Sequence, residues 1–498
     1  MEIAKNVRLF FAISIIILYL VLTSNIYALD IPIDDFSISE YTQNINDYLS
    51  KTREDYSQPL LSKEYQSLQL KEFYKHYYSS NGLSPWSATM IMSILPIVTN
   101  LETEIISQFK FTNNHQHYAE NFKIHTNLWL NKIIQNVNLH TLNNNYLAEN
   151  RAIAINNTFA RSLPDIAPDF FHISLPGQGF PFDNLQEAVI YAGTPLYVLH
   201  TTEDYAWSLV LTPEAYFTWI KSNDLAYVTK TFIKNWQIAA KKSMVAITKT
   251  DTTVMNQYHN YQFNTYIGAV FPLSESSINT INSQQISILI PIKTQYNQAR
   301  IVVGLLNKNA AQIMPLTASK KNLVKIFKQL QNRPYGWGGA FFFNDCSEEL
   351  KNLFTPFGIW LPRNSIQQAQ LDNNLDLSDF NLDTRIANLL QKGHPLMTII
   401  YVGGHVMLYV GKQIINNELV AITYQNIWGL SPADKHKRYI IGQSLFLPLL
   451  KYYPQNPDIM SLAARHDFKL IYLDELNNYT STKDFVKLFN IKHNNTII

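Results

Sequence analysis

The sequence predicts an α+β protein of several domains, with a mostly helical N-terminal part, two small β-barrels, and a C-terminal domain of helices and an antiparallel sheet. Its 498 residues exceed the roughly 250–300 residues over which a single core grows. Apolar residues at helical spacing dominate up to about residue 160, and short alternating runs follow between residues 195 and 305. A Pro-rich passage at 163–182 separates the two patterns and marks the first domain boundary.

The first 28 residues have the pattern of a secretory signal peptide. Lys5 and Arg8 precede an apolar run over residues 9–22, and polar residues then lead to Ala28. We therefore expect cleavage after Ala28 and export to the periplasm or the extracellular space, with no stable membrane insertion afterwards. The alternative is an uncleaved membrane anchor, because the run with its flanks approaches the ~20 residues that span a bilayer.

The patterns divide the chain into six segments. Met90, Ile91, Ile94 and Leu95 illustrate the helical spacing of the N-terminal part. Each barrel is predicted from four short strand patterns, at 195–200, 206–211, 217–220 and 225–228, then at 244–247, 266–271, 285–292 and 299–305. The segments are a signal peptide (1–28), a helical domain (29–165), a first barrel (166–235), a second barrel (236–310), a C-terminal α+β domain (311–455) and a C-terminal extension (456–498).

The charge of the chain argues against a nucleic-acid partner. The formal net charge is +2, with 40 basic residues balanced by 38 acidic ones. Because no strongly basic balance attracts phosphate backbones, we expect no nucleic-acid binding.

Cys346 is the one cysteine of the chain and a candidate nucleophile. It follows a Gly-rich, aromatic turn, and Asp345-Cys346-Ser347 opens an apolar-periodic stretch, so the thiol is expected at a helix start that lowers its pKa. A chain with one cysteine forms no internal disulfide, and an exported thiol must be buried or used. The alternative is a buried structural cysteine that behaves as a small hydrophobe.

His405 is the candidate base. It follows Gly403-Gly404 and opens the second of three predicted antiparallel strands, at 395–402, 405–411 and 419–424. Cysteine-peptidase chemistry needs a thiolate, an imidazole that takes and returns its proton, and a polar group that orients the imidazole. A helix with Cys followed by a sheet with His is the papain-like order. We expect His394 and His436 at the surface.

Several motifs in order resemble one family. They are Tyr335-Gly336-Trp337-Gly338-Gly339, Asp345-Cys346-Ser347, Leu361-Pro362-Arg363-Asn364-Ser365, Gly404-His405-Val406 and Ile427-Trp428-Gly429. Together they resemble the NlpC-type cell-wall cysteine peptidases. Pro85-Trp86, Gly177-Gln178-Gly179 and the two barrels resemble the subgroup with an N-terminal helical stabilising domain and two bacterial SH3-like domains. The resemblance implies a papain-like catalytic domain preceded by two small SH3-like barrels.

The resemblance also implies roles for individual residues. Cys346 would be the nucleophile, His405 the general base and acid, and Gln425 the orienting group at a position where many members have His. Asn426 is the alternative orienting group. An amide oxygen accepts a bond from an imidazole N–H, but it lacks the charge of a carboxylate. Asp345 and Ser347 resemble the residues that hold the free amine and the carboxylates of the substrate; the other substrate-side residues are Tyr335, Trp337 and Ser365.

The function that follows is peptidoglycan hydrolysis. We expect a monomeric cysteine endopeptidase that cuts stem peptides between γ-D-Glu and meso-diaminopimelate. No metal or organic cofactor is implied. The alternatives are a catalytically weak or inactive wall-binding module, and an acyl or amide transferase that uses the same thioester.

Overall fold

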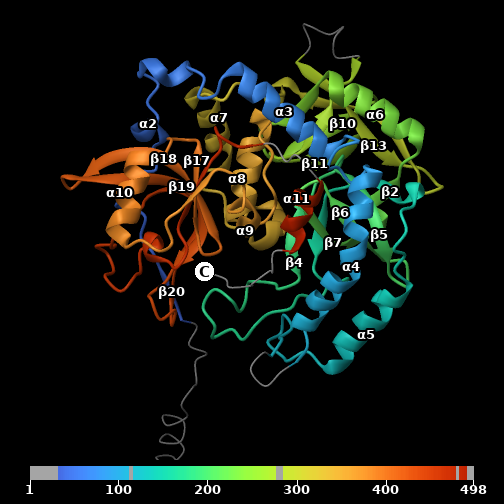
Figure 1. Ribbon diagram of the computed structural model, residues 1–498, viewed down its shortest axis with the longest axis horizontal. Coiled ribbons are helices and arrows are strands. Elements are labelled where there is room, and N and C mark those ends of the chain that lie inside the picture. The colour runs from blue at the N-terminus through green and yellow to red at the C-terminus, as the bar shows by residue number, and fades with distance from the viewer. Residues whose placement is uncertain (1–31, 112–115, 276–283, 478–481, 491–498) are drawn as a thin grey trace, which may run out of the picture.

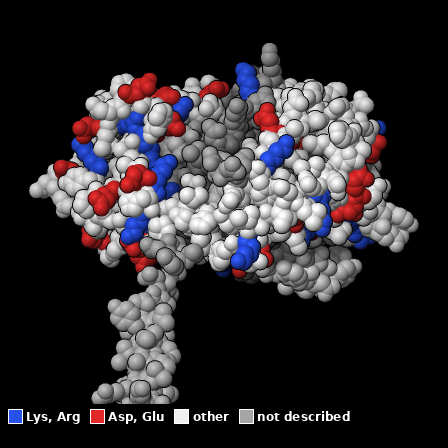
Figure 2. Space-filling model, turned by 90° about the horizontal axis from the view of Figure 1, so that it is seen from below, with Lys and Arg blue, Asp and Glu red and all other residues white. Residues whose placement is uncertain are grey.

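The computed structural model describes residues 32–111, 116–275, 284–477 and 482–490. The predicted signal peptide lies outside these residues. Figure 1 shows the large C-terminal sheet on one side of the molecule and the barrel strands on the other, with helix α8 (Cys346–Phe354) between them. The prediction of a multidomain α+β protein is confirmed. Figure 2 shows basic and acidic side chains intermixed over the described part of one face.

The N-terminal part is helical because Ser caps begin helices with one apolar face. Ser62 and Ser87 accept bonds from the backbone N–H groups of Tyr65 and Met90 at the starts of α3 and α4. Among the described residues, α4 is the one helix long and apolar enough to cross a membrane, but its apolar face lies in the main core. The helices are α2 (Ile45–Tyr48), α3 (Lys63–Tyr77), α4 (Ala88–Gln108) and α5 (Asn127–Val137).

The first barrel is a seven-stranded sheet that begins earlier than predicted. Its order is β4-β3-β7-β6-β5-β2-β8, and β2 and β3 come from residues assigned to the helical domain. The predicted boundary at 165/166 is therefore wrong, because strands of four residues are too short to show alternation. The strands are β2 (Arg151–Ala154), β3 (Thr158–Arg161), β4 (Gln186–Ile190), β5 (Pro195–Thr201), β6 (Trp207–Thr212), β7 (Tyr216–Lys221) and β8 (Leu225–Tyr227).

Helix α6 (Lys230–Lys242) follows the first barrel, so the predicted boundary at 235/236 falls inside a helix. The next strands form a three-stranded sheet, β12-β9-β15, and a four-stranded sheet, β11-β10-β14-β13. They share an apolar core that includes Val245, Phe271 and Ile288. The strands are β9 (Met244–Ile247), β10 (Thr252–Asn256), β11 (Tyr261–Thr265), β12 (Val270–Pro272), β13 (Gln285–Lys293), β14 (Ala299–Asn307) and β15 (Ala311–Ile313).

The C-terminal domain packs helices on a seven-stranded sheet of order β1-β20-β19-β18-β17-β21-β16. β21 pairs with β17, so residues 456–498, predicted to be an extension, contribute a strand to this sheet. A single four-residue strand carries no hairpin signal in the sequence. The strands are β1 (Ile33–Asp35), β16 (Asn374–Asp376), β17 (Thr398–Val402), β18 (His405–Ile415), β19 (Glu418–Leu430), β20 (Arg438–Pro448) and β21 (Lys469–Tyr472).

Helix α8 is the centre of this domain. All nine of its residues are buried, and it packs against β18 and β19. α7 (Lys320–Leu330) and α9 (Ser365–Gln368) contact α8, and α10 (Leu382–Lys392) contacts β19. The last described helix, α11 (Thr482–Val486), contacts α4 of the N-terminal part. The thiol helix and the histidine strand are therefore in direct contact.

Candidate active site

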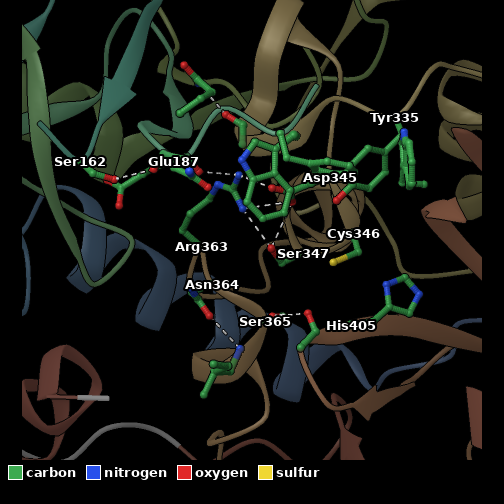
Figure 3. Close-up of a pocket in the computed structure, with 18 of the residues that line it drawn as sticks. Ser162, Glu187, Tyr335, Asp345, Cys346, Ser347, Arg363, Asn364, Ser365 and His405 are labelled. Carbon is green, nitrogen blue, oxygen red and sulfur yellow. Dashed lines mark hydrogen bonds and ion pairs between the residues drawn. The ribbon is translucent and has the colours of Figure 1, made fainter. Parts of the chain in front are cut away.

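A pocket of about 190 Å³ lies where α4, the first barrel and the C-terminal domain meet. Cys346 and His405 both line it, and Figure 3 shows them on the side away from Glu187 and Ser162. The barrel contributes six lining residues, Ser162, Phe182, Asn184, Gln186, Glu187 and Tyr216. The pocket is therefore built by three parts of the chain.

Cys346 is the first residue of α8, as its sequence setting predicts. Asp345 caps the helix by accepting a bond of 2.9 Å from the backbone N–H of Glu348. Burial and the carboxylate of Asp345 raise the pKa of the thiol to about 12, although the backbone N–H groups of Val406 and Ser347 favour the thiolate. The expectation of a lowered pKa is therefore wrong, because desolvation of the thiol exceeds the effect of the helix terminus.

A chain of hydrogen bonds determines which nitrogen of His405 carries the proton. The Thr423 hydroxyl donates to the carbonyl of Leu447 at 2.8 Å, so its oxygen accepts from Nε2 of Gln425 at 2.9 Å. The amide oxygen of Gln425 then faces Nε2 of His405 at 2.7 Å and needs a proton there. Nδ1 is left as the basic nitrogen. Burial lowers the pKa of His405 to about 4, so the ring is neutral.

The alternative orienting residue, Asn426, lies on the other side of β19. Its Nδ2 donates to the carbonyl of Asn344 at 2.7 Å. Successive residues of a strand point to opposite faces, which is why only one of the two amides meets His405. The structure thus brings Gln425, and not Asn426, to the imidazole.

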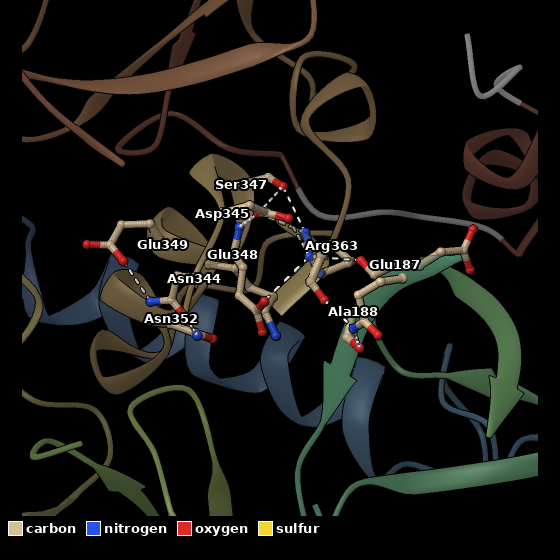
Figure 4. Close-up of polar contacts among 12 residues, drawn as sticks. Glu187, Ala188, Asn344, Asp345, Ser347, Glu348, Glu349, Asn352 and Arg363 are labelled. Carbon is tan, nitrogen blue, oxygen red and sulfur yellow. Dashed lines mark hydrogen bonds and ion pairs between the residues drawn. The ribbon is translucent and has the colours of Figure 1, made fainter. Parts of the chain in front are cut away.

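Asp345, predicted to contact the substrate, forms an ion pair within the protein. Its carboxylate binds the guanidinium of Arg363 in a bidentate pair, with Nη1···Oδ1 at 3.1 Å and Nη2···Oδ2 at 2.6 Å (Figure 4). Ser347 donates to the same carboxylate at 3.1 Å and accepts from Arg363 at 2.9 Å. Both charges of the pair are buried, so the charge of Asp345 is already balanced within the protein.

The remaining predicted residues shape the walls of the pocket. The hydroxyl of Ser365 donates to the carbonyl of Gly404 at 2.8 Å and so fixes the turn before His405. Tyr335 lines the pocket. The indole of Trp337 donates to the carbonyl of Asp183 at 3.0 Å and therefore ties the Gly-rich turn to the first barrel.

The Gly-rich turn needs glycine because the barrel lies against it. Gly338 has a φ of 56°, and a Cβ there would lie 2.4 Å from the carbonyl oxygen of Gln186. The side-chain Nε2 of Gln186 donates a hydrogen bond of 2.7 Å to the carbonyl of Gly338. This motif therefore joins the two domains at the edge of the pocket.

Sequence reasoning missed two charged residues of the site. Arg363 belongs to the motif Leu361-Pro362-Arg363-Asn364-Ser365, but its pairing with Asp345 depends on a contact between separate segments that the motif does not show. Glu187 lines the pocket from β4, and its Oε2 accepts a bond of 3.3 Å from Thr218. No sequence signal identifies Glu187, because the barrel brings it to the site from another domain. Among the described residues, no group of three His, Cys, Asp or Glu could hold a metal ion.

Comparison with protein families gives two matches. Residues 13–142 match the NLPC_P60 stabilising domain, N term, and residues 168–221 match the SH3 domain of the SH3b1 type. The second match covers β4 to β7 of the first barrel. No curated protein matches the chain.

Among solved structures, the chain is similar to an NlpC/P60 endopeptidase from Photobacterium damselae subsp. piscicida. The identity is 26% and the TM-score 0.76, over 89% of this chain and 100% of that one. An NlpC/P60 family protein from Bacillus cereus gives 16% identity and a TM-score of 0.42, over 64% of this chain and 98% of that one, which is too low to carry an argument. The chain thus has the N-terminal stabilising domain and the SH3 domain that the two family models describe, and its structure is similar to that of an NlpC/P60 endopeptidase.

Proposed function

We propose that the protein is an exported cysteine endopeptidase that hydrolyses the bond between γ-D-Glu and meso-diaminopimelate in peptidoglycan stem peptides. The observation that carries this is the oriented imidazole: His405 is held by Gln425 at 2.7 Å in the same pocket as Cys346. The likeness to an NlpC/P60 endopeptidase supports the reaction class.

The proposed mechanism begins from a neutral pair. Nδ1 of His405 takes the thiol proton as Sγ of Cys346 attacks the γ-glutamyl carbonyl, and the backbone N–H of Cys346 at the start of α8 stabilises the oxyanion. The imidazolium then protonates the departing amine, and a thioester remains. Water, deprotonated by His405, attacks the thioester and releases the γ-D-Glu carboxylate and the thiol.

Glu187 is the proposed partner of the substrate's amine. The carboxylate of Asp345 is balanced by Arg363, whereas Glu187 lines the pocket and is bonded to the hydroxyl of Thr218. A free N-terminal amine placed here would form a charge-assisted hydrogen bond with Glu187. Because α4 and the first barrel close this side, we expect stems with a free L-Ala to be cut and stems joined to muramic acid to be excluded.

The two alternative functions, a wall-binding module and a transferase, would leave the stem peptide in different forms. An inactive wall-binding module would hold the stem without cutting it, and a transferase would pass the acyl group to an amine. The hydrogen-bond chain through Gln425 and Thr423 favours an active enzyme, because an orienting group is in place.

The test is mass spectrometry of L-Ala-γ-D-Glu-meso-diaminopimelate incubated with the purified protein. We expect L-Ala-D-Glu and free diaminopimelate, and none from the Cys346→Ala variant. The same stem attached to muramic acid is the matched substrate control. Intact peptide with measurable binding would replace the proposal with the binding module, and an added amine found on the D-Glu γ-carboxyl would replace it with the transferase.

A further inference from the structure

The guanidinium of Arg438, at the first position of β20, is buried without a partner. The residue is 1% exposed, and none of its three side-chain nitrogens bonds to any of the residues that the structure describes. Burial and the neighbouring Arg465 lower its pKa to about 10. A buried charge with no counter-charge strongly destabilises a fold, so its presence here suggests a functional role for Arg438.

Two further cations accompany Arg438, and we call Arg438, Arg465 and Lys435 the cation cluster. Arg465 is 7% exposed; its Nε has no partner among the described residues, and its Nη2 donates to Ser431 at 3.0 Å. Lys435 is exposed, and partial burial together with Arg465 and Arg438 lowers its pKa. The cluster thus extends from the interior to the surface.

The acidic residues of the same loops are already paired elsewhere. Asp434 binds His436 at 2.5 Å, and Asp467 binds His466 at 3.1 Å. Neither forms an ion pair with a member of the cation cluster in the described structure. The cluster therefore carries an excess of positive charge that the described residues do not balance.

A loop of the first barrel covers Arg438. Gly177 has a φ of 72°, and a Cβ at this position would lie 2.5 Å from Nε of Arg438. Only glycine allows this approach. The motif Gly177-Gln178-Gly179 is thus explained by contact with a cation rather than by a turn alone.

Arg465 of the cation cluster lies near His405, and the members of the cluster stand behind the residues that line the pocket rather than among them. The charge of Arg465 contributes to lowering the pKa of His405, and Asp467 lies 3.6 Å from the Cβ position of Gly403, in the turn before His405. Gly429 lines the pocket, and Ser431, two residues later, holds Arg465. Glu187 lies on the other side of the pocket in Figure 3.

We propose that Arg438 and Arg465 bind a carboxylate of the diamino acid that leaves when the peptide is cut. This inference rests on the proposed function. If the substrate amine lies at Glu187, the leaving residue lies toward His405, where these cations are. meso-Diaminopimelate carries a side-chain carboxylate that L-Lys lacks, and guanidinium groups bind carboxylates in bidentate pairs.

The test measures binding to the full chain with Cys346→Ala, by calorimetry, so that it does not depend on turnover. The ligands are L-Ala-γ-D-Glu-meso-diaminopimelate and L-Ala-γ-D-Glu-L-Lys. We expect the first to bind about 10- to 100-fold more tightly, as for a charge-assisted pair. Adding Arg438→Met should remove this preference and leave the affinity for the Lys peptide unchanged.

Thermal unfolding separates this role from a structural one. Met fills a similar volume without charge, so Arg438→Met should unfold at a higher temperature than the parent in the absence of peptide. The more conservative Arg438→Lys keeps the charge and should retain part of the preference. Equal binding of the two peptides by the parent, or a lower unfolding temperature of Arg438→Met with the preference intact, would overturn the proposal.

Two outcomes distinguish this inference from the proposed function. If the wild-type protein cleaves neither peptide but still binds the diaminopimelate peptide more tightly, the function fails and the carboxylate site stands. If it cleaves both peptides at equal rates and Arg438→Met changes neither rate, the site fails and the function stands. Inorganic phosphate that displaces the two peptides equally would identify a general anion site and overturn the assignment to the diamino acid.

Discussion

His405 and Gln425 lie 2.7 Å apart between Nε2 and Oε1, and Thr423 holds the far side of the Gln425 amide. A neutral amide thus occupies the place of an orienting group, and it acts through position and hydrogen bonding alone. The role of Gln425 in the reaction stays a prediction.

Gln425→Ala should lower kcat by about 10- to 100-fold, because the imidazole loses its orienting bond but the thiol and base remain. Steady-state kinetics on the free tripeptide measure this. Thr423→Val is the matched control: it leaves the imidazole contact but frees the amide to rotate, so a smaller loss is expected. A Gln425→Ala enzyme as fast as the wild type would remove Gln425 from the catalytic group.

The alkylation rate of Cys346 should rise about tenfold per pH unit from pH 7 to 10 without a plateau. The reason is that burial raises the pKa of the thiol to about 12, so the reactive thiolate is a small fraction throughout this range. Iodoacetamide labelling followed by mass spectrometry gives the rate, with a cysteine peptide as the reference. A plateau below pH 7 would instead indicate a preformed thiolate–imidazolium pair.

Arg363→Met should lower the free energy of unfolding by about 3–5 kcal/mol, because it leaves the buried carboxylate of Asp345 without its partner. Urea denaturation at pH 7 measures the change. The double variant with Asp345→Asn removes the other charge as well and should recover part of the loss. If Arg363→Met lowers the free energy of unfolding by less than about 1 kcal/mol, Arg363 does not balance the charge of Asp345 in the way we infer.

Glu187→Gln should raise KM for the free tripeptide by about 10-fold or more and change kcat little, because it removes the charge opposite the substrate amine. The N-acetylated tripeptide is the matched control, since it has no amine charge to lose. A variant that affects both peptides equally would place the amine elsewhere in the pocket.

The elements that carry the candidate nucleophile and base could be predicted from the sequence because their signals are local. α8 begins at the Asp-Cys-Ser cap, and β17, β18 and β19 each contain a short apolar run and are joined by short turns. The thiol's pKa was predicted with the wrong sign, because burial depends on what packs over the helix start and not on the helix itself.

The features that could not be predicted from the sequence depend on contacts between segments that are far apart along the chain. β2 and β21 are short strands that form only against partners far along the chain. Glu187 reaches the pocket because the Gly338 turn binds the first barrel, and Arg438 is covered by a loop more than two hundred residues away. The sequence gives the identity of these residues, but it does not show which of them are in contact in the folded protein.

The pocket is lined by residues of α4, the first barrel and the C-terminal domain, so substitutions in these parts should affect different properties of the protein. We expect substitutions in the barrel and in α4 to alter which peptide ends fit, while the thiol, imidazole and amide stay on elements of the C-terminal domain. Selectivity can therefore diverge among relatives through one module without disturbing the reacting atoms in another. Conversely, a fragment limited to the C-terminal domain would keep the reacting groups and lose one side of the cleft, so it should cut a wider range of peptides, each more slowly.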